Sequence, residues 1–128
     1  MNYIPISQPS ITQKEIDYVN DALQSGWISS LGKYVEKFEK MFCEYCDTKY
    51  SITTANGTVA LHLALAALGV SKEDEVIVPD FTYVATANAV RYLGAKVITV
   101  DIDNETYCIS PKAIGMEHQA KLGGVLPG

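Results

Sequence analysis

Between residues 50 and 100 the chain alternates short apolar segments with longer segments of helical pattern. The sequence predicts three strands and two helices in this stretch, in chain order at residues 50–54, 57–68, 75–78, 82–93 and 96–100. Parallel strands need a crossover of about a dozen residues or more, and a helix is the usual crossover. The pattern therefore indicates βαβ units and an α/β fold, with a parallel sheet covered by helices on both faces.

Two amphipathic helices are expected ahead of these strands. Residues 12–15 read Thr-Gln-Lys-Glu, the form of a capping box, and predict the start of a helix that ends near residue 24. Residues 34–45 carry apolar side chains three and four positions apart, which is typical of an amphipathic helix. These apolar side chains are Val35, Phe38, Met41 and Phe42. Residues 27–32 form the loop that joins the two helices.

The composition is that of a globular domain. The chain has 128 residues, of which 48% are hydrophobic and 20% charged, enough for one domain with a core. No apolar run approaches the length of a membrane span and the N-terminus lacks an export signal, so we expect a cytoplasmic protein with no membrane partner. The net charge of −5 argues against a nucleic-acid surface, which needs a basic face.

The cysteines do not indicate a disulfide framework or a metal site. There are three of them, Cys43, Cys46 and Cys108, an odd number in a chain with no export signal. Cys43 and Cys46 form a Cys-x-x-Cys pair inside the helix expected at residues 34–45, and the chain has no second such pair. We therefore expect both to be core or near-core thiols on that helix, and we assign no metal ligand.

The junction before the helix at residues 57–68 is a candidate phosphate site. The first backbone N–H groups of a helix have no internal acceptor, and the helix dipole favours an anion in front of them. Gly57 allows close approach of a ligand to the backbone, and the Thr58 hydroxyl supplies a further donor. We predict that Gly57, Thr58 and Val59 bind a phosphate. The alternative is an ordinary helix start capped by Asn56.

A second loop leaves the end of the strand at residues 75–78. Ligands of open parallel sheets bind at the carboxyl ends of the strands, so this loop and the phosphate turn are expected at the same edge. The loop carries Tyr83, whose ring is suited to a flat phosphorylated cofactor. The alternative for Tyr83 is a core or interface position. The sequence has neither the glycine-rich fingerprint of a Rossmann site nor that of a P-loop.

Taken in order, these motifs resemble the DegT/DnrJ/EryC1/StrS family of pyridoxal-phosphate-dependent aminotransferases of nucleotide-linked keto sugars. The motifs are WISSLG at residues 27–32, NGTVALHLAL at 56–65, DEVIVP at 74–79, TYVATANAV at 82–90 and VDID at 100–103. The resemblance implies part of the large domain of an aspartate aminotransferase-like, fold type I transferase. It also implies pyridoxal 5′-phosphate as cofactor and a homodimer for the full-length protein.

The resemblance implies roles for individual residues. Gly57, Thr58 and Val59 would bind the cofactor phosphate, and Tyr83 would stack on the pyridine ring. Trp27 and Ser29 would lie near the sugar substrate, close to a dimer interface. The alternative for Trp27 and Ser29 is a packed turn between helices.

The implied reaction transfers an amino group from glutamate to a 4-keto-6-deoxy nucleotide sugar, GDP-4-keto-6-deoxymannose. In the family, the Schiff-base lysine and the acidic partner of the pyridine nitrogen lie downstream of the motifs quoted above. No lysine of this chain occupies the matching position, so we assign no catalytic residue and expect the 128-residue chain to be inactive alone. The alternative is a truncated, non-catalytic fragment that only binds a ligand or a partner subunit.

The end of the chain departs from the family pattern. Ser110 and Pro111 predict a helix start, with serine at the cap and proline at the first position. From Gly115 onward the sequence has poor helix character and no strand pattern. We therefore divide the chain into residues 1–114, the N-terminal segment with the first part of the cofactor-binding domain, and residues 115–128, a divergent tail that a frameshift or truncation would explain.

Overall fold

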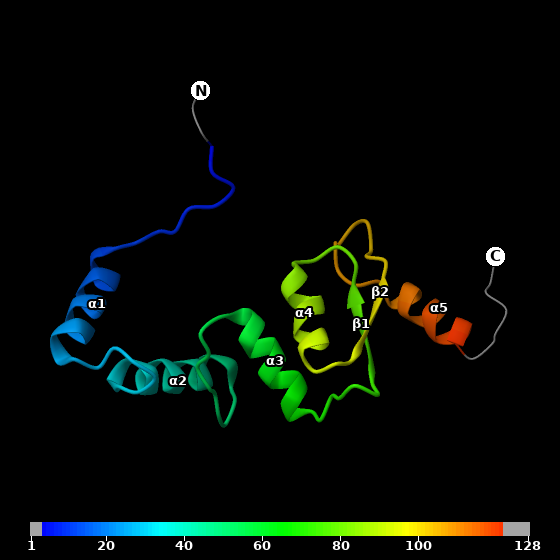
Figure 1. Cartoon of the computed structure of the whole chain (residues 1–128). Helices are drawn as coiled ribbons and strands as arrows, with labels where there is room; N and C mark the ends of the chain where they lie inside the picture. The colour runs from blue at the N-terminus through cyan, green and yellow to red at the C-terminus, as the bar shows by residue number, and fades with distance from the viewer. Residues whose placement is uncertain (1–3, 122–128) are drawn as a thin grey trace. The chain divides into compact units, whose positions relative to one another are not determined.

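A computed structural model describes residues 4–121 (Figure 1), and these residues form two compact units. The first unit ends at Thr53 and the second begins at Thr54. Among residues 4–121, no helix has both the length and the apolar character that a membrane-spanning segment requires.

The first unit contains the two predicted helices, α1 (Gln13–Ser25) and α2 (Lys33–Cys46). At the start of α1, the Glu15 carboxylate accepts a hydrogen bond from the backbone N–H of Thr12 at 2.7 Å, which confirms the predicted helix start. Gly26 ends α1 in the left-handed conformation (φ 75°), which glycine adopts without steric cost.

Side chains of α1 and α2 contact each other at one end of each helix. The Asp21 carboxylate forms an ion pair with Lys33 and accepts a hydrogen bond from the Tyr34 hydroxyl at 2.8 Å. Lys33, which has the larger effect, and Tyr34 both hydrogen-bond to this carboxylate. They hold the pKa of Asp21 below its usual value, because they stabilise its ionised form. The ring centroids of Tyr18 and Tyr34 lie 5.2 Å apart. No residue of either helix is buried, so their apolar faces remain open to solvent.

The two cysteines of α2 differ in exposure. Cys43 is half-buried, as expected for a near-core thiol, but Cys46 is exposed, so that part of the prediction was wrong. Cys46 is the last residue of α2, where the chain turns at Asp47 (φ 52°). Among the described residues, no three His, Cys, Asp or Glu side chains are grouped as metal ligands would be.

The strand predicted at residues 50–54 is not formed. A strand needs a neighbouring strand for its backbone hydrogen bonds, and within residues 4–121 none pairs with this segment. The segment is bound to α2 instead, where the Ser51 hydroxyl donates to the backbone carbonyl of Glu39 at 2.7 Å. The apolar and β-branched residues of the segment predicted its extended character but not its partner.

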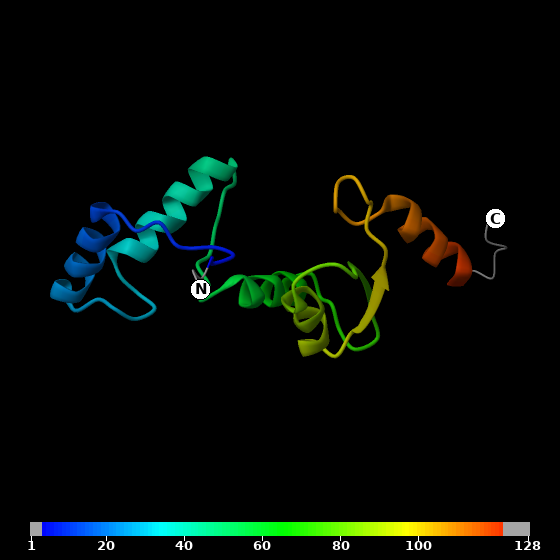
Figure 2. The same cartoon turned by 90° about the horizontal axis from the view of Figure 1, so that it is seen from above.

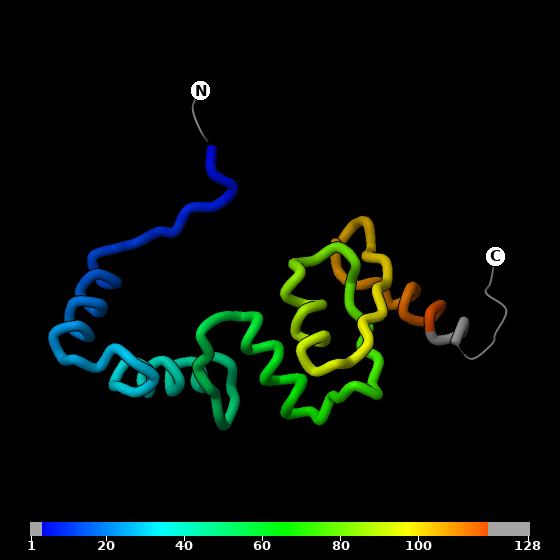
Figure 3. Tube along the Cα trace, in the orientation of Figure 1, coloured from blue at the N-terminus to red at the C-terminus, as the bar shows by residue number. Residues whose placement is uncertain are grey.

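The second unit has the alternating order expected of a βαβ fold. Its elements are α3 (Gly57–Ala67), β1 (Glu75–Pro79), α4 (Val84–Tyr92), β2 (Lys96–Val100) and α5 (Pro111–Lys121). The two strands are parallel and in register from the pair Glu75 and Lys96 to the pair Pro79 and Val100. The α/β class and both of these strands are therefore confirmed (Figure 1), and Figure 3 traces the path of the chain through them.

The core of the second unit lies between α4 and the two strands. Val78, Val90 and Ala95 form a buried cluster, and half-buried Leu65 of α3 packs against it. The helices α4 and α5 lie on opposite sides of the strands in both views of the chain (Figures 1 and 2). The helix α3 packs on α4, where the rings of His62 and Tyr92 meet edge to face at 5.6 Å.

The expectation that helical structure is lost at Gly115 was wrong. α5 begins as predicted, with the Ser110 hydroxyl accepting from the backbone N–H of Ala113 at 3.3 Å, and it continues past Gly115 to Lys121. A glycine inside a helix costs about 1 kcal/mol relative to alanine, which weakens a helix without ending it, and contacts with β2 support α5. Residues 122–128 of the predicted tail lie outside the described residues.

Candidate functional site

The candidate site lies where the parallel strands end. The loop that follows β1 is tied to the end of β2, because the backbone N–H of Asp80 donates to the carbonyl of Val100 at 3.0 Å. α4 begins at the end of the sheet toward which the β1 arrow points in Figure 1, and α3 begins farther to the left in the same view. This arrangement is the one expected for ligand sites of open α/β sheets.

The start of α3 has both the Asn56 cap and the free N–H groups that the sequence predicted. Asn56 caps the helix, with its side-chain oxygen accepting from the backbone N–H of Val59 at 3.1 Å. The N–H groups of Gly57 and Thr58 precede the first intrahelical bonds and have no acceptor among the described residues. Gly57 and Thr58 therefore offer free donors to an anion, whereas the N–H of Val59 already serves the cap.

Gly57 faces open space. A Cβ atom added at this position would have no atom within 4 Å, and its φ is not in the left-handed region. The backbone of the turn is thus accessible from that side, which is the condition for a ligand to approach the free N–H groups.

Tyr83 occupies the position before the first residue of α4 (φ −62°, ψ 140°) and its side chain is 89% exposed. It lines a hollow of about 450 Å³ together with the preceding loop and one residue from beyond β2. The lining residues are Asp80, Phe81, Thr82, Tyr83 and Tyr107. Tyr83 is therefore available for a ligand, and its stacking role stays a prediction.

Two aromatic residues of this hollow were not identified from the sequence. Phe81 and Tyr107 have ring centroids 6.5 Å apart and planes tilted by 46°. Phe81 lies in the loop after β1, two positions before Tyr83, so its place in that loop was a usable signal. Tyr107 had no such signal, because its position depends on how the chain folds back after β2.

Asp103 begins the turn that leads to Tyr107. Its carboxylate accepts hydrogen bonds from the backbone N–H of Thr106 at 2.9 Å, from the Thr106 hydroxyl at 3.0 Å and from the N–H of Glu105 at 3.1 Å. These hydrogen bonds stabilise the ionised carboxylate and so hold the pKa of Asp103 below its usual value. The two bonds from Thr106 have the largest effect. Asp103 therefore shapes the turn as a carboxylate.

Trp27 and Ser29 lie in the first unit, whereas Gly57, Thr58, Val59 and Tyr83 lie in the second. Trp27 is 60% exposed and lines a hollow of about 440 Å³ with Lys33 and Glu36, among others. Ser29 is exposed and is not among the residues that line this hollow. The substrate-binding role of Trp27 and Ser29 stays a prediction.

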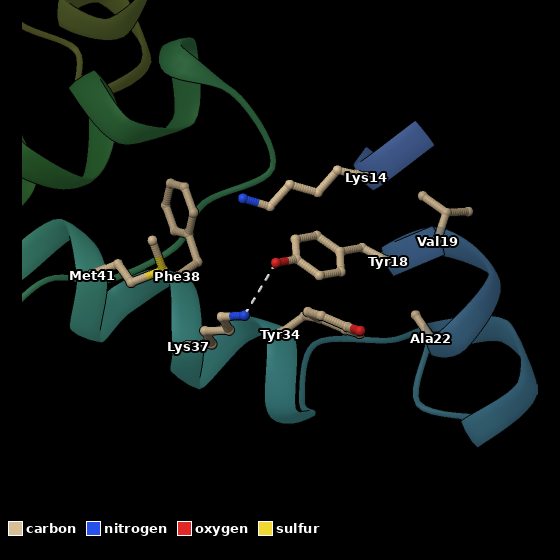
Figure 4. Close-up of a pocket in the computed structure, with 8 residues that line it drawn as sticks. All are labelled: Lys14, Tyr18, Val19, Ala22, Tyr34, Lys37, Phe38 and Met41. Carbon is tan, nitrogen blue, oxygen red and sulfur yellow. Dashed lines mark hydrogen bonds between the residues drawn. The ribbon is translucent and has the colours of Figure 1, made fainter. Parts of the chain in front are cut away.

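The first unit also has a groove of about 600 Å³ between α1 and α2 (Figure 4). Its walls are mostly apolar and aromatic, and two lysines line it. Lys37 donates to the Tyr18 hydroxyl at 3.3 Å and lies 4.8 Å from the ring centroid, while Lys14 lies 5.8 Å from the same centroid. Both ammonium groups thus contact Tyr18, and neither lines the aromatic hollow at the strand ends.

Comparison with known proteins places this chain in a family. The sequence profile of the DegT/DnrJ/EryC1/StrS aminotransferase family matches residues 9–127. The chain is 58% identical to a GDP-perosamine synthase of Escherichia coli O157:H7 over 126 residues, which is 98% of this chain and 35% of the relative. It is 43% identical to a GDP-perosamine synthase of Vibrio cholerae, over 96% of this chain and 34% of the relative. The chain therefore spans about a third of the length of these relatives.

Solved structures give the same result for the fold. An aminotransferase from Psychrobacter cryohalolentis superposes with a TM-score of 0.79 at 40% identity, over 87% of this chain and 29% of that protein. The protein Spr1654 of Streptococcus pneumoniae, solved in PLP and PMP forms, superposes with a TM-score of 0.80 at 37% identity, over 87% of this chain and 28% of that protein. These neighbours indicate pyridoxal phosphate as the cofactor and a partial fold type I domain. The chain belongs to the DegT/DnrJ/EryC1/StrS aminotransferase family.

Proposed function

We propose that the full-length protein is a sugar aminotransferase that converts GDP-4-keto-6-deoxymannose to its 4-amino sugar, with glutamate as the amino donor. The observation that supports this proposal best is the 58% identity to a relative named GDP-perosamine synthase over nearly the whole of this chain. The full-length enzyme acts as a homodimer in the cytoplasm under this proposal.

The residues at the strand ends fit pyridoxal phosphate. The free N–H groups of Gly57 and Thr58 and the open space beside Gly57 suit a phosphate in front of α3. The exposed ring of Tyr83 suits a pyridine ring, because stacked aromatic pairs gain about 0.5–1.5 kcal/mol beyond their area burial. Val59 completes the turn, with its N–H held by the Asn56 cap.

Each group in this chain has a positioning task in the proposed reaction. The amides of Gly57 and Thr58 hold the phosphate, and the Tyr83 ring fixes the plane of the pyridine. Trp27 and Ser29 contact the sugar. Bound pyridoxal phosphate supplies the electron sink on which transamination depends. No lysine lines the described hollow beside Tyr83, so these residues bind and orient but do not themselves move the proton.

A second candidate function is non-catalytic. The chain spans about a third of its relatives, and no residue of the described hollow is of the type that bonds covalently to the cofactor aldehyde. Under this alternative the 128-residue chain binds a ligand or a partner subunit and turns over no substrate. The two candidates are compatible, because one concerns the full-length protein and the other this chain.

The test of the first candidate follows the nitrogen atom. The full-length gene product is incubated with ¹⁵N-labelled glutamate and GDP-4-keto-6-deoxymannose, and the sugar product is analysed by mass spectrometry. We expect the label to appear in a 4-amino sugar nucleotide. Absence of labelled product with this sugar, but transfer to another keto sugar nucleotide, would contradict the substrate and retain the reaction type.

The test of the second candidate uses the 128-residue chain alone. The chain is treated with pyridoxal phosphate and borohydride, and peptides are mapped for stable adducts. We expect no adduct at a single site and no turnover. One dominant modified lysine together with turnover would overturn the non-catalytic candidate.

A further inference from the structure

The chain folds back immediately after β2 into a tightly hydrogen-bonded loop. Ile102 and Ile109 form an antiparallel bridge at its base. The N–H of Asp103 donates to the carbonyl of Cys108 at 2.8 Å, and the N–H of Tyr107 donates to the carbonyl of Asp103 at 2.8 Å. Tyr107 is therefore held in a fixed place at the carboxyl end of β2.

Tyr107 has an unfavourable backbone conformation. Its φ is 56°, in the left-handed region that a bulky residue seldom occupies and that glycine or asparagine occupies at lower cost. A residue of this kind in a strained conformation is a reason to look for a functional role. The backbone alone would favour glycine or asparagine at this position.

The Tyr107 side chain does not obtain compensating burial. It is 67% exposed, and it shares its hollow with Phe81 at 69% and Tyr83 at 89% exposure. Three aromatic rings thus gather in one hollow at the ends of the two strands. Convergent rings in a hollow are typical of sites for flat ligands.

We propose that Tyr107 is a binding residue of this site, an aromatic wall beside Tyr83 that contacts a flat conjugated ring. The inference rests on the proposed function for the identity of the ring, a pyridine whose phosphate lies at α3. Phe81 supports the Tyr107 ring from the loop after β1, at 6.5 Å between centroids. The strained backbone of Tyr107 places the ring at the hollow. Backbone stability therefore favours glycine or asparagine at this position, whereas ligand binding favours tyrosine.

The test uses pyridoxine 5′-phosphate, which lacks the aldehyde and so forms no bond with lysines. It is titrated into the ¹⁵N-labelled chain and followed by the backbone signals of Gly57, Thr58 and Tyr83. The variants are Tyr107→Phe, Tyr107→Asn and Tyr107→Gly. The control is Tyr45→Asn, an exposed tyrosine of the first unit that lies outside the hollow. Pyridoxine without phosphate is the second probe.

We expect Tyr107→Asn and Tyr107→Gly to weaken binding by about two- to tenfold, the range for one aromatic contact. Both variants should keep or raise the thermal midpoint, because they relieve the strained φ. Tyr107→Phe should bind within about twofold of the parent chain, and Tyr45→Asn should bind like it. A residue with a purely structural role would instead lower the midpoint when removed.

The remaining outcomes separate this inference from the proposed function. Unchanged binding in Tyr107→Asn and Tyr107→Gly, with shifts still seen at Gly57 and Thr58, overturns the role of Tyr107 and retains the phosphate site. Ring-dependent shifts at Tyr83 with either probe, and none at Gly57 or Thr58, support the aromatic wall and overturn the phosphate site. No response to either probe overturns both.

Discussion

The carboxylate of Glu39 on α2 accepts hydrogen bonds from the backbone N–H of Thr53 at 2.8 Å and from the Thr53 hydroxyl at 3.0 Å. One side chain thus binds two donors of a residue fourteen positions away. Thr53 is half-buried, so its N–H would be costly to leave without an acceptor. Glu39 therefore takes the place of a neighbouring strand at the end of the first unit.

Glu39→Ala should lower the free energy of unfolding by about 1 kcal/mol, because the partly buried Thr53 N–H loses its acceptor. Glu39→Gln keeps an acceptor oxygen and should lose less. The measurement is urea unfolding followed by circular dichroism, with hydrogen exchange of the Thr53 amide as the local reading. Glu44→Ala is the control on the same helix. Equal losses in Glu39→Ala and Glu44→Ala would contradict the role of the carboxylate.

Asn56→Asp should separate helix capping from anion binding at the start of α3. Aspartate caps helices as well as asparagine does, so the thermal midpoint should stay within a few degrees. Its negative charge lies beside the free N–H groups of Gly57 and Thr58, so it should strongly weaken binding of pyridoxine 5′-phosphate. Binding is measured by calorimetry. Undiminished binding in this variant would show that the turn is only a cap.

Asn56→Ala is the complementary change. It removes the acceptor of the Val59 N–H at 3.1 Å and should cost about 1 kcal/mol of stability. It also frees a third N–H group toward the phosphate position, so binding should be retained. Loss of binding at temperatures where the helix is still folded would count against the proposed phosphate site.

Gly57→Ala should affect binding more than folding. The added methyl group meets no atom within 4 Å, and alanine is a better helix former than glycine, so stability should be kept or raised. The methyl group occupies the open side of the turn and should weaken phosphate binding by about tenfold, or about 1.4 kcal/mol. Gly115→Ala is the matched control, because its added methyl group also meets open space, within α5. Weaker binding in both variants would point to an indirect effect.

Asp103 should make the loop that carries Tyr107 sensitive to acid. Its pKa is lowered in the folded loop, so its contribution to stability is complete above the unfolded value near 3.9 and is lost as pH falls through the lowered folded value. The Thr106 amide signal, followed by NMR from pH 6 to pH 2, should shift as those hydrogen bonds are lost. Asp103→Asn should abolish the titration, and an identical pH profile in that variant would assign the effect to another group.

The exposed apolar surface of α3 should cause self-association of the chain. Val59, Leu61 and Leu63 are each more than 40% exposed and Leu68, at the end of the helix, is 80% exposed. Sedimentation velocity at micromolar concentration should detect oligomers or aggregates. Leu68→Glu should reduce association without loss of stability, because this side chain is mostly exposed in the folded chain and contributes little to the core. A monomeric parent chain that unfolds cooperatively would contradict the prediction.

The sequence predicted those elements whose signals are local. β1 and β2 are runs of β-branched residues that end at Pro79 and Val100, and the structure forms both. The segment at residues 50–54 has the same local character, but a strand also requires a partner, and Glu39 supplies the hydrogen bonds instead. The course of α5 past Gly115 was missed for a related reason, because helix propensity does not include packing on β2.

The residues of the candidate site also differ in whether a local sequence signal predicted them. Motif and expected topology predicted Gly57, Thr58 and Tyr83, and their binding roles stay predictions. The structure forms the strand that precedes the Tyr83 loop, but not the strand expected before Gly57. Tyr107 was not predicted, because its place depends on the bridge between Ile102 and Ile109 and on a left-handed backbone that tyrosine rarely adopts. Its contribution to the hollow is therefore visible only in the folded chain.

The buried cluster of the second unit has a consequence for synthesis on the ribosome. Its members Val78, Val90 and Ala95 are close in sequence and are joined by one helical crossover. Contacts of short sequence separation form early, since little loop-closure entropy must be overcome. This small nucleus is thus able to assemble while later residues of a longer nascent chain are still being translated, and it offers the outer edges of β1 and β2 as a template for the strands that emerge afterwards.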